Sequence, residues 1–312
     1  MNRRWRDKRI GVLMGGTSHE REISLKTGNA ILNALQEMGY KAVGIEVSFD
    51  IVKRLLDEKI DVAFIALHGR WGEDGTVQGL LELLRIPYTG SGVLASALAM
   101  NKIKTKEIFL YHGIPTPEFV IPGEEEPQEL PFPPPWVVKP ASEGSTIGVS
   151  IAYDKEALGE ALHRARQYDR QILIERFILG KELTVGILKG EPFPIVEIVP
   201  KSGFYDYRAK YTPGMTEYII PARIEEHKQQ EVQRWSLKAY DVLGCSGCAR
   251  VDLFLSNAGE IYITEVNTLP GMTETSLVPK AAAYKGISFP QLVQIILEEA
   301  SLKIEGGQGE KR

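Results

Sequence analysis

Apolar positions in the first third of the chain follow two alternating spacings. Short apolar runs, which are typical of buried strands, occupy residues 9–14, 41–47 and 61–67. Between them, apolar side chains recur every three or four residues, which predicts amphipathic helices, and Gly39 ends the first of these. Strands that alternate with helices in this way favour a parallel α/β domain. The glycine turns lack a G-x-G-x-x-G motif, so the pattern does not support a dinucleotide site.

The central part of the chain changes to short strands that are separated by turns. Residues 136–139 form a predicted strand that ends at Lys139, and the EGSTIG sequence at residues 143–148 is a small, glycine-rich turn. Backbone N–H groups of such a turn can cover phosphates, with Lys139 as a point charge beside them. A plain hairpin with a surface lysine fits these residues equally well.

A strand, an interruption and a second strand are predicted over residues 171–188. Apolar and acidic side chains gather around the interruption, namely Glu175, Phe177, Ile178 and Glu182. A nucleobase pocket requires an apolar slot with hydrogen-bonding edges and an acid for the ribose hydroxyls, and this segment offers all three. The same residues are also compatible with an ordinary connection between strands.

A hairpin is predicted over residues 249–275, where β-branched and aromatic residues flank a Ser-Asn-Ala-Gly turn. Because side chains alternate along a strand, Arg250 and Asp252 share a face of the first arm. Glu265 and Asn267 share a face of the second arm. Pairing of the arms brings two carboxylates and an amide oxygen together, which suits Mg²⁺, and places Arg250 to bind phosphate or an oxyanion. A solvated hairpin face with a surface ion pair is the alternative.

Single polar residues also stand at places where a small ligand can bind. Glu20 follows the first strand and can hold an ammonium group, or serve as a helix N-terminal acid that complements the dipole. His68 follows the third strand, where a purely structural role is the alternative. Gly271 permits close approach of the backbone, and Ser276 offers a hydroxyl near a helix start.

An aromatic segment punctuated by Gly and Pro at residues 203–221 predicts a long loop. Long ordered loops in compact domains tend to be lids or binding loops. Lys210 and Tyr211 are its polar groups that can reach a ligand. Packing of its tyrosines on the body of the protein is the alternative.

The composition narrows the class of protein. The 312 residues carry a net charge of −4, which gives no global basic field for nucleic acid or an acidic membrane. No apolar run approaches the roughly 20 residues that a membrane helix needs. The two cysteines, Cys245 and Cys248, form a single CxxC pair that we interpret as buried, inert thiols. A cytoplasmic location is expected.

Six segments of the chain together form a specific pattern. They read GGTSHEREISL, ALHGRWGEDGTVQGLLELLRIPYTGSGVLASALAMNK, VVKPASEGSTIGVS, FYDYRAKY, RVDLFL and EVNTLPGMTETSLVPK. In this order they resemble the ATP-grasp superfamily, and within it the D-alanine–D-alanine ligases, over nearly the whole chain. One departure is visible, because the family usually has Asp-Lys where this chain has Asn101-Lys102.

The resemblance implies a three-domain ATP-grasp fold that combines α/β and α+β architecture. Residues 1–98 would form an N-terminal parallel α/β substrate domain, residues 99–183 a central domain and residues 184–312 a C-terminal domain. ATP would lie between two antiparallel sheets of the last two domains. Residues 203–221 and 143–148 would close over the reactants.

The same resemblance implies roles for residues by their position in the motifs. ATP would be bound by Lys102, Lys139, Glu175, Phe177, Ile178, Glu182 and Lys210. Two Mg²⁺ or Mn²⁺ ions would be held by Asp252, Glu265 and Asn267. The first D-alanine would be bound by Glu20 and His68, with Ser145 and Tyr211 completing a hydrogen-bonded link to Glu20. The tetrahedral intermediate would be stabilised by Arg250 and the Gly271 amide, and the second D-alanine bound at Ser276 and Leu277.

The implied activity is ATP-dependent ligation of two D-alanine molecules through a D-alanyl phosphate, for peptidoglycan precursor synthesis. A homodimer through the first domain is also implied, with no nucleic-acid or membrane partner. A D-alanine–D-lactate ligase or another dipeptide ligase of the same fold is one alternative, and Lys210-Tyr211 argues against the lactate enzyme. A non-catalytic nucleotide-binding protein is another, and the combination of acids, lysines and Arg250 argues against it.

Overall fold

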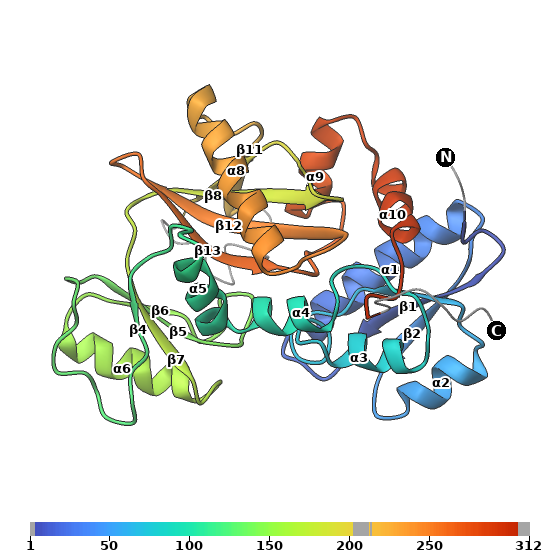
Figure 1. The fold of residues 1–312 in the computed structure, drawn as a ribbon, viewed down its shortest axis with the longest axis horizontal. Helices are drawn as coiled ribbons and strands as arrows, with labels where there is room; N and C mark the ends of the chain where they lie inside the picture. Colours follow the sequence, from blue (N-terminus) through green and yellow to red (C-terminus); the bar gives the residue numbers. More distant parts are fainter. Residues whose placement is uncertain (1–3, 202–211, 213, 305–312) are drawn as a thin grey trace.

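The computed structural model describes residues 4–201, 212 and 214–304. Within these ranges, three β-sheets with their own helices follow one another along the chain, as Figure 1 shows. One sheet is parallel and the other two are antiparallel. The predicted combination of a parallel α/β unit with antiparallel sheets is therefore confirmed.

The first sheet is parallel, with the strand order β2-β1-β3. Its strands are β1 (Arg9–Gly15), β2 (Lys41–Val47) and β3 (Val62–Ile65). The helices between and after them are α1 (Arg21–Glu37), α2 (Ile51–Asp57) and α3 (Thr76–Leu83). All of β1 after its first residue is buried, because helices cover both faces of a parallel sheet, and such strands read as continuous apolar runs.

The last helix of the chain returns to the first sheet. Helix α10 (Phe289–Glu298) lies along α1, and both contribute to one apolar core with β1. Leu292, Val293, Ile296 and Leu297 on one face of α10 are buried there. The start of α10 is fixed by a capping box at Ser288. The core of the first sheet is thus completed by residues near the end of the chain.

The second sheet is antiparallel, with the order β4-β7-β5-β6. Its strands are β4 (Phe119–Val120), β5 (Trp136–Pro140), β6 (Ser150–Ala152) and β7 (Ile172–Arg176). Helix α6 (Lys155–Arg166) packs on it, and its buried face contacts Val138 and Ile174 in one apolar cluster. The predicted strand over residues 136–139 is therefore confirmed.

The third sheet is antiparallel and runs in the order β11-β10-β8-β12-β13, with β9 paired to β8. Its strands are β8 (Gly180–Leu188), β9 (Glu191–Pro192), β10 (Val196–Pro200), β11 (Thr216–Ile219), β12 (Cys248–Ser256) and β13 (Ile261–Asn267). Its helices include α8 (Glu226–Val242) and α9 (Leu277–Tyr284). The predicted domain boundary between residues 183 and 184 falls within β8, and the division of the chain stays a prediction.

Part of the long loop predicted over residues 203–221 is a strand instead. Residues 216–219 form β11, which pairs with the edge strand β10 from Thr216 to Ile219. The Gly and Pro residues around this segment indicate a loop, but the unpaired edge of a sheet offers backbone partners that the sequence pattern does not show. Residues 203–211 and 213 lie outside the described residues.

Two helices connect the first sheet to the second and third. Helix α4 (Val93–Met100) and helix α5 (Lys102–Tyr111) run in succession and are separated at Asn101. Asn101 has extended backbone (φ −90°, ψ 102°), and its side-chain oxygen accepts the Lys104 N–H at 3.0 Å. This cap begins α5 in a new direction, which places Lys102 at its first turn.

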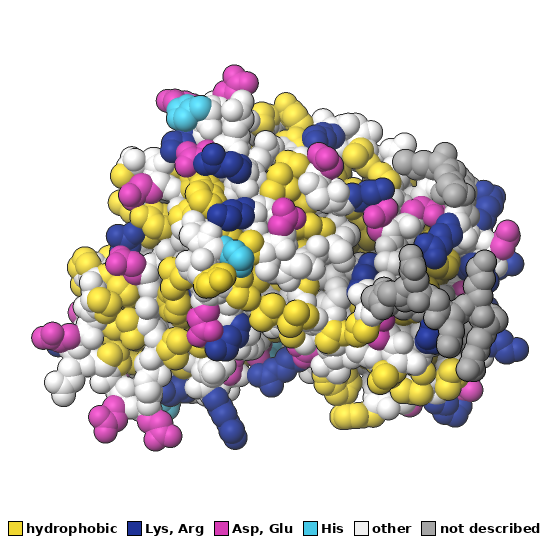
Figure 2. Space-filling model, viewed as in Figure 1, with side chains coloured by type: hydrophobic (Ala, Val, Ile, Leu, Met, Phe, Trp, Pro, Cys, Tyr) yellow, Lys and Arg dark blue, Asp and Glu magenta, His cyan; other side chains and the backbone are white. Residues whose placement is uncertain are grey.

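The surface and the two cysteines agree with the expectations from composition. Side chains of both charges are interspersed over the face that Figure 2 shows. Among the helices in the described ranges, none has the combined length and apolar character needed to cross a membrane. Cys245 and Cys248 are free thiols, and burial raises the pKa of each to about 12. Both are therefore protonated near neutral pH, Cys248 is buried and Cys245 partly buried, and their interpretation as inert thiols stays a prediction.

Candidate active site

The predicted hairpin forms, and its two arms are β12 and β13. The register places Asp252 directly opposite Glu265, and Arg250 opposite Asn267. Apolar residues that alternate with these polar ones along β12 are buried. A β-bulge interrupts the pairing after Asp252, and Thr264 is the extra residue on β13. The Thr264 hydroxyl donates to the Asp252 carbonyl at 2.9 Å. The bulge keeps the polar residues of both arms on the same side of the sheet.

The carboxylate of Asp252 is held by two other side chains. Arg250 donates to both of its oxygens, from Nε to Oδ1 at 2.8 Å and from Nη2 to Oδ2 at 2.7 Å. Thr184 on β8 donates to Oδ1 at 2.5 Å. A bidentate guanidinium–carboxylate pair fixes the planes of both groups. Arg250 and Asp252 therefore stand in a defined orientation on this face.

The oxygen atoms of the hairpin suit a divalent metal ion. Asp252 and Glu265 present hard carboxylate ligands on facing strands, and Asn267 adds an amide oxygen. The Leu269 N–H donates to Asn267 Oδ1 at 3.0 Å, which identifies the oxygen and leaves it a second lone pair. In the part of the chain that the structure describes, no cluster of three His, Cys, Asp or Glu side chains competes with this set. The donors fit Mg²⁺ or Mn²⁺, and their assignment as ligands stays a prediction.

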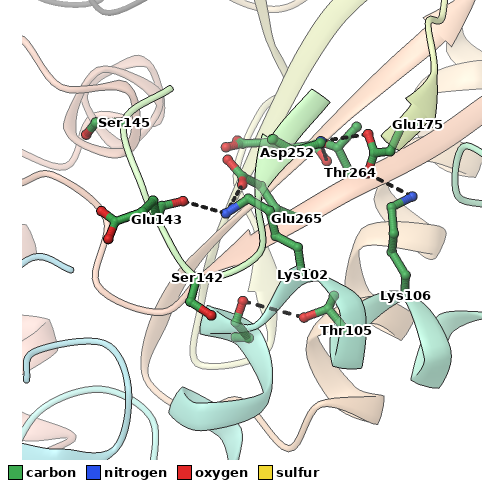
Figure 3. A network of polar contacts seen from close by, with 12 residues as sticks. Lys102, Thr105, Lys106, Ser142, Glu143, Ser145, Glu175, Asp252, Thr264 and Glu265 are labelled. Atoms are coloured by element: carbon green, nitrogen blue, oxygen red, sulfur yellow. Dashed lines mark hydrogen bonds and ion pairs between the residues drawn. The ribbon is translucent and has the colours of Figure 1, made fainter. Parts of the chain in front are cut away.

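Lys102 reaches the hairpin from the first turn of α5. Its Nζ donates to the Glu143 carbonyl at 2.7 Å and lies 3.4 Å from Glu265 Oε2, as Figure 3 shows. Asn101 caps the helix just before it, as an aspartate at this position would. The departure from the family pattern at Asn101 therefore leaves Lys102 directed into the site.

A cavity of about 400 Å³ lies between the second and third sheets, and we call it the Glu175 cavity. It is lined by all the described residues predicted to bind ATP, namely Lys102, Lys139, Glu175, Phe177, Ile178 and Glu182. Glu175 is only 2% exposed, and its Oε2 lies 2.6 Å from Lys139 Nζ. Phe177 and Ile178 follow in the connection to β8 and supply apolar wall. The cavity thus combines a buried charged end with an apolar slot.

A second cavity of about 420 Å³ lies between the first sheet and the hairpin, and we call it the Glu20 cavity. It is lined by the described residues predicted to bind D-alanine or to stabilise the intermediate, namely Glu20, His68, Ser145, Arg250, Gly271, Ser276 and Leu277. These residues come from all three parts of the chain. The fold therefore brings together groups that are more than 200 positions apart in the sequence.

Glu20 stands at the start of α1 and is 7% exposed. The Ser145 hydroxyl donates to its Oε1, which joins the glycine-rich turn at residues 143–148 to the first sheet. A Cβ atom added to Gly144 would lie 2.7 Å from Glu20 Oε2, so a side chain at that position would displace the carboxylate. Ser145 itself has a φ of 51°, in the left-handed region. The close contact between turn and carboxylate is therefore built into the backbone.

His68 is buried in the wall of the Glu20 cavity. Its Nε2 lies 3.2 Å from the Thr27 hydroxyl, and its carbonyl accepts the Ser18 hydroxyl at 2.7 Å. Burial lowers the pKa of His68, against an opposing effect of the Glu20 carboxylate. The imidazole is therefore neutral near pH 7, and hydrogen bonding is the way in which it can act on a ligand.

The opposite wall of the Glu20 cavity is formed by the segment between β13 and α9. Ser276 is the residue before α9, and its hydroxyl oxygen accepts the Thr273 N–H at 3.1 Å. Gly271 approaches it closely, because a Cβ atom there would lie 3.3 Å from Ser276 Oγ. Together they form a polar corner that suits a small anionic group.

The two cavities share one boundary. The residues that line both are Lys102, Glu143, Gly144, Ser145, Arg250, Glu265 and Leu277. Two cationic and two acidic residues therefore stand where a ligand in one cavity meets a ligand in the other. Lys210 and Tyr211 lie outside the described residues, so their predicted roles stay predictions.

Sequence reasoning did not identify three buried charged residues around the site. Glu73 lines the Glu20 cavity at 8% exposure, and its Oε2 accepts the Gly69 N–H at 2.7 Å. Glu143 is held by Arg70, whose Nη2 donates to its Oε1 at 3.1 Å. Lys106 lies behind the Glu175 cavity. The Gly-Glu-Asp-Gly turn was the one available signal for Glu73, because glycines allow a carboxylate to fold back on the backbone.

Burial, together with the nearby Glu20 carboxylate, raises the pKa of Glu73 to about 8. The folded protein thus binds this proton more tightly than the unfolded chain, whose carboxyl group titrates near 4.5. The free energy of unfolding should therefore fall as the pH rises from about 4.5 to 8. In Glu73→Gln this contribution is absent, so the variant should gain up to about 3 kcal/mol at pH 7 relative to the wild type.

Urea denaturation of both proteins at pH 5 and at pH 8 checks this prediction. The exposed Glu22 on α1, changed to Gln, is the control and should keep the wild-type pH dependence. Parallel pH dependence in the wild type and Glu73→Gln would show that Glu73 titrates normally in the fold.

Comparison with known proteins places the chain in a family. The model of the D-Ala–D-Ala ligase C-terminus matches residues 117–298, and the model of the N-terminus matches residues 49–91. The chain belongs to the D-alanine–D-alanine ligase family. A D-alanine–D-alanine ligase of Syntrophotalea carbinolica is 54% identical over 95% of this chain and 97% of its own length.

Other members of the D-alanine–D-alanine ligase family agree with this placement. The enzyme of Pelotomaculum thermopropionicum is 50% identical over 94% of this chain and 96% of its own. The D-alanine–D-alanine ligase of Bacillus anthracis, crystallised in complex with ATP, is 38% identical and superposes with a TM-score of 0.82 over 94% of this chain and 97% of its own. The family and the ATP-grasp architecture expected from the six sequence segments are therefore confirmed.

Proposed function

We propose that this chain joins two D-alanine molecules to D-alanyl-D-alanine, with conversion of ATP to ADP and phosphate, for peptidoglycan precursor synthesis. The observation that carries the proposal is the shared boundary of the Glu175 and Glu20 cavities. Arg250, Lys102 and Glu265 stand at that boundary, where a phosphoryl donor in one cavity faces a carboxylate in the other. Relatives about half identical to this chain are named D-alanine–D-alanine ligases.

ATP binds in the Glu175 cavity in this proposal. Its base enters the slot at Phe177 and Ile178, and its phosphates extend toward Lys139 and Lys102 at the shared boundary. Lysine ammonium groups neutralise phosphate charge as the phosphoryl group transfers. Lys210, in the segment outside the described residues, is proposed to reach the γ-phosphate.

The first D-alanine binds in the Glu20 cavity. Its ammonium group pairs with the Glu20 carboxylate, which the Ser145 hydroxyl holds in place. His68, neutral through burial, lies in the same wall, near the position proposed for the substrate carboxylate. One oxygen of that carboxylate attacks the γ-phosphorus of ATP, which forms D-alanyl phosphate and releases ADP.

Asp252, Glu265 and Asn267 would hold Mg²⁺ or Mn²⁺, which supplies charge neutralisation for phosphoryl transfer when it is bound. The amine of the second D-alanine then attacks the acyl carbon, and the resulting tetrahedral oxyanion is stabilised by Arg250 and the Gly271 N–H. Phosphate leaves as the new amide bond forms. The carboxylate of the second D-alanine lies at Ser276 and Leu277, on the wall that faces Glu20.

An acylphosphate hydrolyses in water, so the site must close before phosphoryl transfer. We propose that the turn at residues 143–148 and the segment at residues 203–221 provide this closure. Two hydrogen bonds connect the turn to segments that follow strands of the first sheet. Ser145 donates to Glu20, and Arg70 donates to Glu143. These contacts support the closure role of the turn.

ADP release with ATP, Mg²⁺ and D-alanine, with the product mass recorded, tests the function. Formation of D-alanyl-D-alanine and one ADP per dipeptide is expected, and L-alanine should give neither. Formation of a depsipeptide from D-alanine and D-lactate would show that the chain is instead the alternative, a D-alanine–D-lactate ligase. Bound ATP without ADP formation under any of these substrates would overturn the proposal.

We also propose a cytoplasmic location, where ATP is available, and a homodimer formed through the first sheet and its helices. Large apolar side chains on this part of the molecule support the dimer: Phe49 is 89% exposed, Leu83 is 84% exposed and Leu56 is 59% exposed. Light scattering should give twice the 34.7 kDa of one chain. A molar mass of one chain at micromolar concentration would rule the dimer out.

A further inference from the structure

Lys106 on α5 is completely buried, although lysine seldom is. Its Nζ lies 2.6 Å from the Thr116 hydroxyl, 2.9 Å from the Pro117 carbonyl and 3.1 Å from Glu175 Oε1. The first two contacts are hydrogen bonds and the third is an ion pair, so the buried ammonium group has both polar partners and a counter-charge. Figure 3 shows Lys106 of α5 directed at Glu175. Lys106 does not line the Glu175 cavity itself.

Glu175 is therefore held between two lysines. Lys106 binds Oε1 from behind, and Lys139 binds Oε2 from the cavity wall at 2.6 Å. Burial alone would raise the pKa of Glu175, but the two ammonium groups outweigh it and hold that pKa below its ordinary value. Burial also lowers the pKa of Lys106, to about 8, so both partners are charged at pH 7. Glu175 thus presents an ionised carboxylate of fixed orientation to the cavity.

We infer that Lys106 is a positioning residue that locks Glu175 as a hydrogen-bond acceptor, and that this lock selects a purine with a 6-amino group over one with a 6-oxo group. The inference rests on the proposed binding of ATP in the Glu175 cavity. An ionised carboxylate can only accept hydrogen bonds, so it binds an amino group and repels a carbonyl oxygen. Lys106 makes this choice without contact with the nucleotide.

Lys106 also affects the net charge around Lys139 and Glu175. One carboxylate shared by two ammonium groups leaves a net positive charge at this end of the cavity, which favours the anionic nucleotide. Without Lys106, the buried Glu175 would either bind Lys139 more closely or take up a proton. A protonated Glu175 carries an O–H donor, which suits the 6-oxo group of inosine. Loss of Lys106 should therefore weaken ATP binding and improve relative use of ITP.

The experiment compares kcat/KM for ATP and for ITP at pH 7 in the wild type, Lys106→Met and Lys106→Gln. The wild type should prefer ATP by about a hundredfold or more. Each variant should lower that ratio at least tenfold, with the KM for D-alanine changed less than threefold. The dissociation constants of both nucleotides, measured by calorimetry, should show the same loss of preference, and this readout does not depend on ligation.

Two controls separate charge from packing. Lys104 is two residues away on the same helix and 55% exposed, so Lys104→Met should keep the wild-type ratio. Thr116→Val removes one partner of Lys106 but keeps its charge and should also keep the ratio. An equal loss for ATP and ITP in both Lys106 variants, or no change in either, would overturn the inference. If the wild type binds ATP more tightly than ITP but makes no dipeptide, the proposed ligation is refuted. The inference about Lys106 still stands in that case.

Discussion

Glu265→Gln should lose about a thousandfold in ligation rate while keeping its fold. Glu265 faces Asp252 across the hairpin, lines both cavities and lies 3.4 Å from Lys102. At the shared boundary, Glu265 is the carboxylate that forms part of the proposed metal site and also pairs with Lys102, the lysine proposed to face the phosphates. Glutamine keeps the shape but removes the charge, which weakens the metal site and leaves Lys102 with one anionic partner fewer.

The rate is measured as ADP release at saturating ATP and D-alanine, over a range of Mg²⁺ concentrations. The thermal midpoint should stay within about 2 °C of the wild type, because the Glu265 side chain is partly exposed and glutamine fits its place. Glu260, an exposed residue at the turn of the same hairpin, is the control, and Glu260→Gln should retain full activity. Turnover of Glu265→Gln within tenfold of the wild type would remove Glu265 from the reaction.

Glu20→Gln should lower kcat/KM for the first D-alanine by about a hundredfold. The proposed ammonium partner is 7% exposed, and an ammonium group left in this cavity without a counter-charge is destabilised by roughly 3 kcal/mol. Glu20 does not line the Glu175 cavity, so the KM for ATP should change little. The loss should therefore appear for one of the two D-alanine sites and not for the nucleotide.

Initial rates over a wide range of D-alanine concentration, at fixed ATP, separate the two sites. Glu37→Gln at the exposed far end of α1 is the matched control and should behave as the wild type. A Glu20→Gln variant in which the KM values for ATP and for both D-alanine sites rise together would indicate a general disturbance of the fold. In that case the pairing of Glu20 with the substrate ammonium would be wrong.

The sequence predicted those parts of the site that depend on local periodicity. The period of two in a strand was sufficient to place Arg250 with Asp252 on one face of β12, and Glu265 with Asn267 on one face of β13. The bulge at Thr264 could not be foreseen from the pattern. Without it, the last residues of β13 would point to the opposite face.

Buried charges were beyond prediction, and α5 shows why. Lys104 and Lys106 stand two positions apart in a run of alternating lysines, yet one side chain is 55% exposed and the other 0%. The difference comes from Glu175 on β7, which is some 70 positions away and reaches Lys106 only when the second sheet packs against α5. Likewise, β11 became a strand because β10 offers it an edge. The partner of Lys106 and the partner strand of β11 both lie outside the local sequence, so the local pattern cannot reveal either of them.

The return of α10 to the first sheet has a consequence for the order in which the protein can fold during synthesis. The apolar core of β1 and α1 includes Leu292, Val293, Ile296 and Leu297, which leave the ribosome long after β1 and α1. The residues of β1 and α1 must therefore wait, with apolar surface uncovered, until α10 has been translated. The second sheet carries its own apolar cluster from residues 120–174 and can form earlier. The first sheet is thus completed only after α10 has been made, and a chain shortened before α10 would leave the ribosome with that surface still exposed to chaperones and proteases.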